Sequence, residues 1–158
     1  MSNKPYKVAL TYGTFDLFHI GHVQLIKRIR LMADRVIVGV STDDFNLTKG
    51  KKTIIPFEHR SEIVANIVGV DLVIPESSWD QKELDIKKYD VDLFVIGDDW
   101  AGKFDYLSDL CVVKYLERTR DVSSTALKTA LHGVDKEKLK QLKQFINAAV
   151  DIAGELVD

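Results

Sequence analysis

The sequence predicts an α/β fold, a Rossmann-like doubly wound sheet of five parallel strands. Two observations support this. Short apolar runs rich in β-branched residues alternate with segments whose apolar residues recur every three or four positions. The runs do not alternate polar and apolar residues, so helices are expected to cover both faces of each strand. Right-handed crossovers then favour a doubly wound arrangement.

Five apolar runs are the expected strands. In chain order they are residues 6–12 (YKVALTY), 36–40 (VIVGV), 71–75 (DLVIP), 93–97 (LFVIG) and 111–116 (CVVKYL). The third run contains Pro75, which is expected to end that strand because proline lacks the N–H group that a ladder needs.

Helices are expected between these strands. Residues 20–32 and 57–68 repeat apolar residues at helical spacing, and residues 81–89 form a charged segment. Residues 123–132 follow a serine–threonine cap signal and precede Gly133. Residues 41–55 are expected to be a loop.

The end of the chain predicts an extra amphipathic helix over residues 135–157. Its apolar positions repeat at three and four: Leu139, Leu142, Phe145, Ile146, Ala149, Val150, Ala153 and Leu156. We expect one domain over residues 1–133 and a C-terminal helical extension over residues 134–158. The helix is expected to pack on its own domain or on the partner in a homodimer. Mixed charges on its polar face disfavour a membrane-surface helix.

Composition excludes several classes of protein. The net charge is −2 and the pI about 6.1, which gives no overall attraction to nucleic acid or to an acidic membrane. One cysteine, Cys111, allows no intramolecular disulfide. No secretory signal and no apolar run of the ~20 residues that a membrane span needs is present. A cytoplasmic protein is expected.

Ligands of doubly wound folds bind at the carboxyl ends of the strands, so the loops there are candidate sites. The first carries Gly13 and then two histidines, His19 and His22, on either side of Gly21. Two histidines alone fit a buried pair or a metal site as well as a phosphate site. A zinc site normally has three or more protein ligands, and no third ligand is evident near the two histidines. The glycines and the following helix N-terminus favour phosphate binding.

The other loops add side chains that could bind anions or a nucleobase. Lys49, Lys51 and Lys52 form a basic loop, and Arg60 either grips a phosphate or pairs with Glu58 or Glu62. Trp79 either walls an acceptor pocket or packs in the core. Asp99 either accepts from an amino group such as cytosine N4 or caps the segment near residues 103–107. Ser123, Ser124 and Thr125 begin a helix, where phosphates bind.

Two segments resemble the signatures of a known superfamily. Gly13-Thr14-Phe15-Asp16 with His19-Ile20-Gly21-His22 resembles the signature of the HxGH nucleotidyltransferases. Residues 118–125 (RTRDVSST) resemble the second signature of that superfamily. From about residue 7 to residue 133, the chain most closely resembles the bacterial glycerol-3-phosphate cytidylyltransferases. Four stretches carry this closer resemblance: residues 41–46 (STDDFN), 58–60 (EHR), 70–76 (VDLVIPE) and 97–100 (GDDW).

The resemblance implies transfer of CMP from CTP to sn-glycerol 3-phosphate, which gives CDP-glycerol and pyrophosphate for a surface polymer of the teichoic acid or capsule type. It implies Mg²⁺ on the triphosphate, with Asp16 as a possible ligand. The catalytic residues would be His19, His22, Lys51 and Arg118. The nucleotide site would comprise Gly13, Thr14, Phe15, His19, Gly21, His22, Lys51, Asp99, Arg118, Thr119, Val122, Ser123, Ser124 and Thr125. The acceptor site would comprise Lys49, Arg60, Trp79 and Lys82.

Some alternatives stay open at this point. The same chemistry could act on another polyol or alcohol phosphate, or use ATP as the donor. Asp121 stands where the family often has glycine, which bears on strictness for CTP. A nucleotide-binding module without turnover is disfavoured by the full set of charged loops. An NAD-binding domain is disfavoured because no G-x-G-x-x-G follows the first strand.

Overall fold

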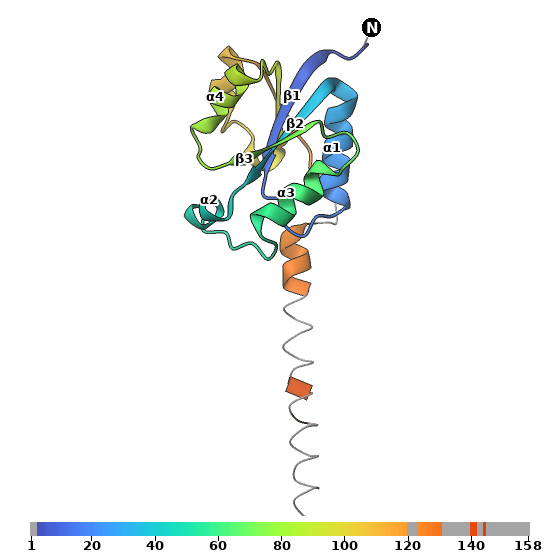
Figure 1. Cartoon of the computed structure of the whole chain (residues 1–158), viewed down its shortest axis with the longest axis vertical. Coiled ribbons are helices and arrows are strands. Elements are labelled where there is room, and N and C mark those ends of the chain that lie inside the picture. Colours follow the sequence, from blue (N-terminus) through green and yellow to red (C-terminus); the bar gives the residue numbers. More distant parts are fainter. Residues whose placement is uncertain (1–2, 120–122, 131–139, 142–143, 145–158) are drawn as a thin grey trace, which may run out of the picture. The chain divides into compact units, whose positions relative to one another are not determined.

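The computed structural model describes residues 3–119, 123–130, 140–141 and 144. Five parallel strands form one sheet in the order β3-β2-β1-β4-β5. They are β1 (Tyr6–Gly13), β2 (Ala33–Ser41), β3 (Leu72–Glu76), β4 (Leu93–Gly97) and β5 (Val112–Leu116). The predicted Rossmann-like sheet is confirmed, with the first strand at its centre (Figure 1).

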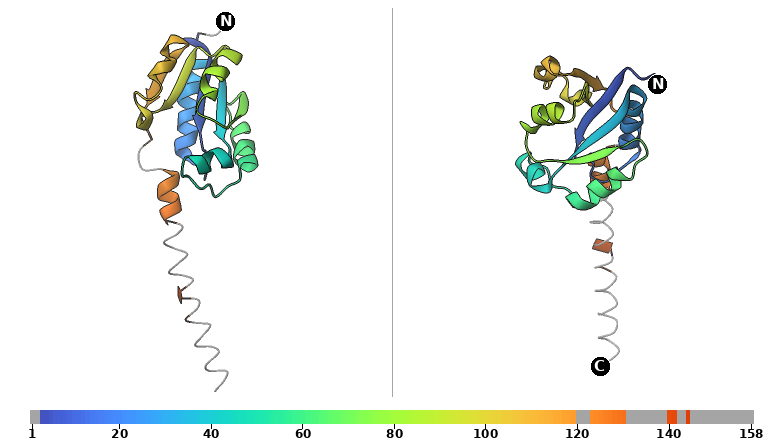
Figure 2. Two further views of the ribbon diagram at one scale, coloured as in Figure 1. Left: turned by 90° about the vertical axis from the view of Figure 1, so that its left-hand side faces the viewer. Right: turned by 45° about the horizontal axis from the view of Figure 1, so that its top comes forward.

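Helices connect the strands. They are α1 (Ile20–Met32), α2 (Asp43–Thr48), α3 (Phe57–Ala65) and α4 (Gln81–Lys88), with 3₁₀ turns η1 (Asp98–Trp100) and η2 (Asp105–Asp109) between β4 and β5. Figure 2 shows helices on both sides of the sheet.

Two apolar clusters, one on each face of the sheet, account for the doubly wound arrangement. One cluster joins Ala9 and Val38 of the sheet to Ile29 of α1 and Val64 of α3. The other joins Leu10, Ile37 and Phe94 of the sheet to Ile86 of α4 and Leu107 of η2. Neighbouring residues of one strand therefore enter different clusters, because successive side chains of a strand point to opposite faces.

The main differences from the sequence-based expectation are three element boundaries and one additional helix. β2 starts at Ala33, directly after α1, and α3 ends at Ala65. The short helix α2 lies where a loop was expected, and the Thr42 side chain caps it by accepting a hydrogen bond from the Phe45 N–H. Pro75 does not end β3, which continues to Glu76. β3 is an edge strand, where a proline N–H is not needed for a second neighbour.

The chain divides into two units, with the boundary between residues 122 and 123. In the second unit, residues 124–130 are helical, which agrees with the helix expected from residue 123. The predicted boundary at residues 133/134 and most of the predicted C-terminal helix lie outside the described residues. Among the described helices, none is long and apolar enough to cross a membrane.

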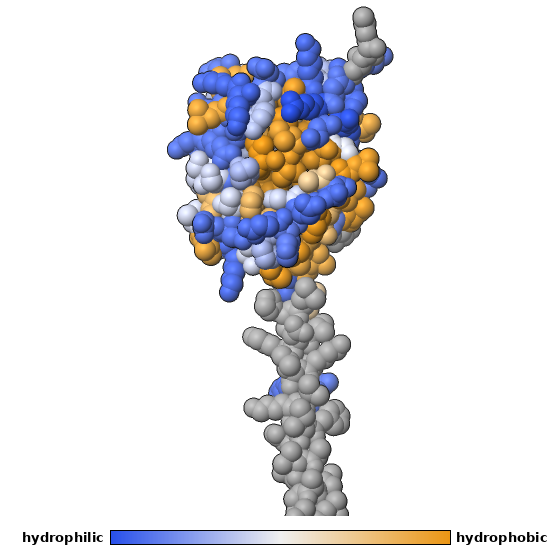
Figure 3. All heavy atoms as spheres, in the orientation of Figure 1, coloured by the Kyte–Doolittle hydropathy of each residue, from blue (hydrophilic) through white to orange (hydrophobic). Residues whose placement is uncertain are grey.

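Several large apolar side chains of the first unit are exposed. On the face shown in Figure 3, apolar residues gather in the middle, and more of them lie toward the right side and below a band of hydrophilic residues. The most exposed ones in the described chain are Val68 at 94%, Leu31 at 76%, Leu84 at 68% and Leu47 at 64%.

Candidate active site

The turn between β1 and α1 holds the two histidines in a reciprocal cap. His19 is the N-cap residue of α1, and its Nδ1 accepts a hydrogen bond from the Gly21 N–H at 3.0 Å. His22 Nδ1 accepts a bond from the His19 N–H at 3.2 Å. This arrangement has the geometry of a capping box, with imidazoles in place of the usual oxygen acceptors. The rings lie nearly parallel with centroids 3.9 Å apart.

The hydrogen bonds fix which nitrogen of each ring carries hydrogen. Because both Nδ1 atoms accept from the backbone, each neutral ring carries its hydrogen on Nε2. Burial, His19 and Arg118 lower the pKa of His22 to about 4, against a small opposing effect of Asp16. Burial and then Arg118 also lower the pKa of His19. Near neutral pH the turn therefore presents two uncharged Nε2–H donors.

Aromatic side chains pack against the histidine turn. Phe15 is 3% exposed, and its ring lies 5.2 Å from the His22 ring and 6.4 Å from the Phe18 ring. Phe15 and Leu17 have φ values of 53° and 49°, a left-handed conformation that costs energy for these residues. A Cβ on Gly13 would lie 2.8 Å from the Phe15 ring, which explains the glycine. The Phe15 side chain belongs to the core. The part of Phe15 in nucleotide binding stays a prediction.

Arg118 and Asp99 lie beside the histidines on the other half of the sheet. Arg118 follows β5, and its guanidinium lies 3.8 Å from the Asp99 carboxylate of η1. Both side chains are largely exposed, at 63% and 48%. Asp99 does not cap the following turn η2, whose N-cap residue is Phe104. The His19–His22 turn follows β1 and Asp99 follows β4, so they flank the point where strand order reverses.

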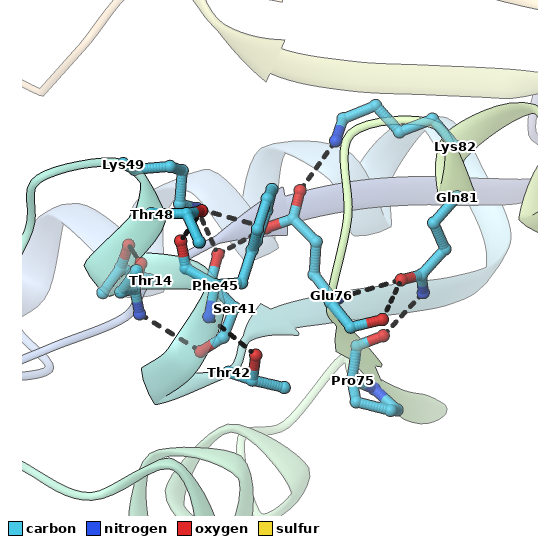
Figure 4. Close-up of polar contacts among 12 residues, drawn as sticks. Thr14, Ser41, Thr42, Phe45, Thr48, Lys49, Pro75, Glu76, Gln81 and Lys82 are labelled. Carbon is cyan, nitrogen blue, oxygen red and sulfur yellow. Dashed lines mark hydrogen bonds and ion pairs between the residues drawn. The ribbon is translucent and has the colours of Figure 1, made fainter.

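Three of the predicted acceptor residues come together around a carboxylate that the sequence did not single out. Lys82 Nζ donates to Glu76 Oε1 at 2.7 Å, and Lys49 Nζ lies 3.6 Å from Glu76 Oε2 (Figure 4). The Trp79 ring lies 4.9 Å from Lys82 Nζ and 5.6 Å from Lys49 Nζ. Trp79 is 42% exposed, so it forms a wall of this group rather than part of the core.

Register between neighbouring strands explains how Glu76 enters the group. Ser41, at the end of β2, pairs with Glu76, at the end of β3. The Ser41 hydroxyl donates to the Glu76 carboxylate and accepts a bond from Lys49 Nζ at 2.9 Å. A charged residue directly after an apolar run was the available signal. The proline before Glu76 weakened this signal, because a proline in an apolar run suggests that the strand ends there.

The expectation that Arg60 binds substrate is wrong. Its side chain is fully buried, and its three nitrogens donate to Ile55 O, Thr14 O and the Asp43 carboxylate. The alternative that Arg60 pairs with Glu58 or Glu62 is also wrong, because Arg60 forms its ion pair with Asp43. Arg60 instead ties α3 to the two loops that carry the histidines and lysines.

Asp16 holds the lysine loop through both oxygens of its carboxylate. It is 2% exposed, and its two oxygens accept bonds from the Ile54 and Ile55 N–H groups at 2.9 and 3.0 Å. Within the described part of the chain, no group of three or more His, Cys, Asp or Glu residues could hold a metal ion.

The remaining predicted residues are placed as follows. Thr14 Oγ1 donates to Asn46 Oδ1, whose amide donates to Ser41 O, so the histidine and lysine loops are connected. Lys51 is exposed, with Nζ 6.0 Å from the Trp100 ring. Thr119 is half-buried.

The second signature is only partly described. Val122 lies outside the described residues. Ser123, Ser124 and Thr125 belong to the second unit, where Ser123 Oγ accepts a bond from the Ala126 N–H and so caps the helix.

The chain is similar to known proteins over most of its length. A family described as cytidylyltransferase-like matches residues 10–130. Glycerol-3-phosphate cytidylyltransferase of Staphylococcus aureus (strain NCTC 8325 / PS 47) is 51% identical, with 82% of this chain and 98% of that protein covered. The Bacillus subtilis (strain 168) protein of the same name is 49% identical, with 81% and 99% covered.

A solved structure agrees on the fold. The lipopolysaccharide core biosynthesis protein of Thermoplasma volcanium GSS1 superposes with a TM-score of 0.62 at 21% identity, covering 72% of this chain and 96% of that one. The family match and the two relatives extend over most of the chain and over nearly the full length of those relatives. The chain therefore belongs to the cytidylyltransferase-like family and is a nucleotidyltransferase.

Proposed function

We propose that the chain transfers CMP from CTP to sn-glycerol 3-phosphate, giving CDP-glycerol and pyrophosphate. The observation that carries this proposal is that two groups of side chains able to bind anions lie at the carboxyl ends of neighbouring strands. The two histidines follow β1, and Lys49 and Lys82 gather around Glu76 at the ends of β2 and β3. A donor triphosphate and an acceptor phosphate each need such a group. The names of the two 49–51% identical relatives supply the donor and acceptor.

The reaction is an in-line displacement at the α-phosphorus of CTP. An oxygen of the acceptor phosphate attacks, a new P–O bond forms, and the bond to the bridging α–β oxygen breaks as pyrophosphate leaves. The attacking phosphate is ionised at neutral pH, so no general base is needed. Catalysis then consists of bringing two anions together and stabilising the charge that develops.

Each group has a role that fits its state. The neutral Nε2–H donors of His19 and His22 donate to oxygens of the transferred phosphoryl group. Lys51 and Arg118 add positive charge for the triphosphate, and Asp99 accepts from the cytosine amino group. Lys49 and Lys82 bind the acceptor phosphate, and Trp79 walls its pocket. Gly13, Thr14, Phe15, Gly21 and Thr119 also contribute backbone and hydroxyl groups to the nucleotide site.

Magnesium enters this proposal as part of the substrate. A Mg²⁺ ion on the triphosphate neutralises charge and keeps most of its ligands as phosphate oxygens and water, so it needs no protein cage. A cytoplasmic location belongs to the proposal because CTP is a cytoplasmic nucleotide. We further propose a homodimer, supported by exposed apolar residues such as Val68 and Leu31. The product would serve synthesis of a surface polymer.

The test is a pyrophosphate-release screen of four nucleoside triphosphates against a panel of phosphorylated alcohols. We expect release only with CTP, and most rapidly with sn-glycerol 3-phosphate. If pyrophosphate is released most rapidly with another polyol phosphate, that compound is the acceptor in place of sn-glycerol 3-phosphate. If pyrophosphate is released only with ATP, CTP is not the donor. CTP binding without pyrophosphate release from any acceptor would contradict an enzymatic role.

A further inference from the structure

The carboxylate of Glu76 lies at the centre of the acceptor group and is itself buried. It is 3% exposed, although it ends an edge strand. Its two oxygens meet Lys82 Nζ at 2.7 Å, Lys49 Nζ at 3.6 Å and the Ser41 hydroxyl (Figure 4). Lys49 directly follows α2, and Lys82 lies in the first turn of α4. One carboxylate thus joins two ammonium groups from separate elements.

The charges of this group do not cancel. Two ammonium groups and one carboxylate leave one positive charge in a place with little water, where Lys82 is 1% exposed and the Lys49 side chain 10%. An ion pair with a purely structural role needs one lysine. The second lysine leaves the group positively charged and suited to an anion.

Aromatic rings surround the two cations. Lys82 Nζ lies 4.6 Å from the Tyr12 ring, and Lys49 Nζ lies 4.2 Å from the Phe45 ring, in addition to their contacts with Trp79. The faces of such rings stabilise cations but do not fix the distance between them. Among the described residues, Glu76 is the carboxylate that pairs with both lysines, so it sets their spacing.

We propose that Glu76 is a positioning residue of the acceptor site, which holds Lys49 and Lys82 side by side so that together they bind the phosphate group of the acceptor. This inference rests on the proposed function. Glu76 acts through the two lysines and does not contact the reacting atoms.

The neighbouring charges show what the loss of Glu76 would do. Burial lowers the pKa of Lys49, and Lys51 and Lys82 lower it further, whereas Glu76 opposes these effects. Asp85 does not substitute for Glu76, because it accepts bonds from the Tyr12 hydroxyl and the Gln81 amide. Without Glu76, the pKa of Lys49 therefore falls further, and the acceptor site loses the positive charge of Lys49 at a lower pH than in the unsubstituted chain.

The experiment compares the full chain with Glu76→Gln, which keeps the size and removes the charge. Glu83→Gln, an exposed position next to Lys82, is the matched control. For Glu76→Gln we expect KM for sn-glycerol 3-phosphate to rise roughly tenfold, as when one charge-assisted hydrogen bond is weakened. The KM for CTP and kcat at saturating acceptor should change little. The alkaline limb of kcat/KM for the acceptor should move to lower pH.

A purely structural role predicts a different result. It would lower the fraction of folded enzyme, seen in urea unfolding, and leave KM and the pH profile as in the unsubstituted chain; that outcome overturns the inference. If Glu76→Gln does not fold, Glu76→Asp serves instead: it keeps the charge, so KM should rise while the alkaline limb stays in place. An unchanged KM in Glu76→Asp would also count against the inference.

Failure of the proposed function is recognised separately. It shows as absence of pyrophosphate release by the unsubstituted chain with CTP and sn-glycerol 3-phosphate. Calorimetric titration with sn-glycerol 3-phosphate alone, without CTP, then tests Glu76 apart from turnover. Weaker binding to Glu76→Gln than to Glu83→Gln supports the positioning role, and equal binding refutes it.

Discussion

At the scale of single residues, the two histidines combine a structural and a chemical role. Each Nδ1 accepts a backbone N–H at the start of α1, which leaves each Nε2–H as a donor for a ligand. The cap orients the rings before substrate arrives, and preorganised donors of this kind stabilise developing charge most effectively.

Replacing either histidine by alanine should reduce kcat by roughly two orders of magnitude or more, the usual cost of losing one preorganised donor. His59→Ala is the control, because His59 is an exposed histidine of α3. Pyrophosphate release gives kcat, and circular dichroism checks the fold. Turnover near that of the unsubstituted chain in either variant would remove that histidine from the mechanism.

The low pKa of His22 predicts how stability depends on pH. The value of about 4 in the folded chain lies below the ordinary 6.5, so the neutral ring favours the folded state. This contribution is present above pH 6.5 and is lost as the pH falls from 6.5 toward 4. Urea unfolding across that range should show a steeper loss for the unsubstituted chain than for His22→Gln. Equal slopes would contradict the assignment, as would an NMR titration of the ring near 6.5.

Arg60 provides the contrasting case of a charged residue that stabilises the fold. Because its buried guanidinium has three protein acceptors, Arg60→Met should lower the free energy of unfolding by about 3 kcal/mol, typical of a broken buried charge contact. Urea unfolding measures this change. An unaltered stability with a raised KM for the acceptor would instead restore Arg60 to the substrate site.

At the scale of elements, the contact between β1 and β2 positions the acceptor group. A Cβ on Gly39 of β2 would lie 2.1 Å from the Tyr12 ring of β1. That ring packs under Lys82, and its hydroxyl donates to Asp85 of α4 at 2.7 Å. The glycine thus lets a large ring connect the sheet to α4.

Gly39→Ala should therefore destabilise the chain by about 1–3 kcal/mol, the usual cost of overpacking. We also expect a higher KM for the acceptor, because the displaced Tyr12 ring moves Lys82. Thermal unfolding and steady-state kinetics test the two effects. Tyr12→Phe is the companion variant, since it keeps the ring and removes only the hydroxyl bond to Asp85. If the stability of Gly39→Ala is unaltered, the Tyr12 ring makes room for the added methyl group at no cost, which contradicts this prediction.

At the scale of the whole molecule, the catalytic unit and the end of the chain are separable in sequence. The family match ends at residue 130, and the relatives are covered over 98–99% of their length. A chain shortened to residues 1–133 should therefore keep a turnover close to that of the full chain. If residues 134–158 build the dimer, light scattering should show the mass of the shortened chain halved. A large loss of turnover in the shortened monomer would instead make these residues part of the active unit.

The sequence by itself determined the class of fold and the chemistry of the loops. Apolar periodicity predicts the strands and helices, because burial on two sheet faces or on one helix side is encoded locally. The histidine turn and the basic loop likewise depend on residues close in sequence, and the family resemblance rested on the same stretches.

Tertiary structure decided which partner each buried charge meets. Arg60 was expected to bind substrate but bonds to Thr14 O, 46 residues earlier in the chain. Glu76 became central because the register of β3 on β2 sets it opposite Ser41. Asp16 holds the lysine loop through N–H groups 38 and 39 residues away. A buried charge needs a partner, but strand register and helix packing decide which one, and neither is written in a local pattern.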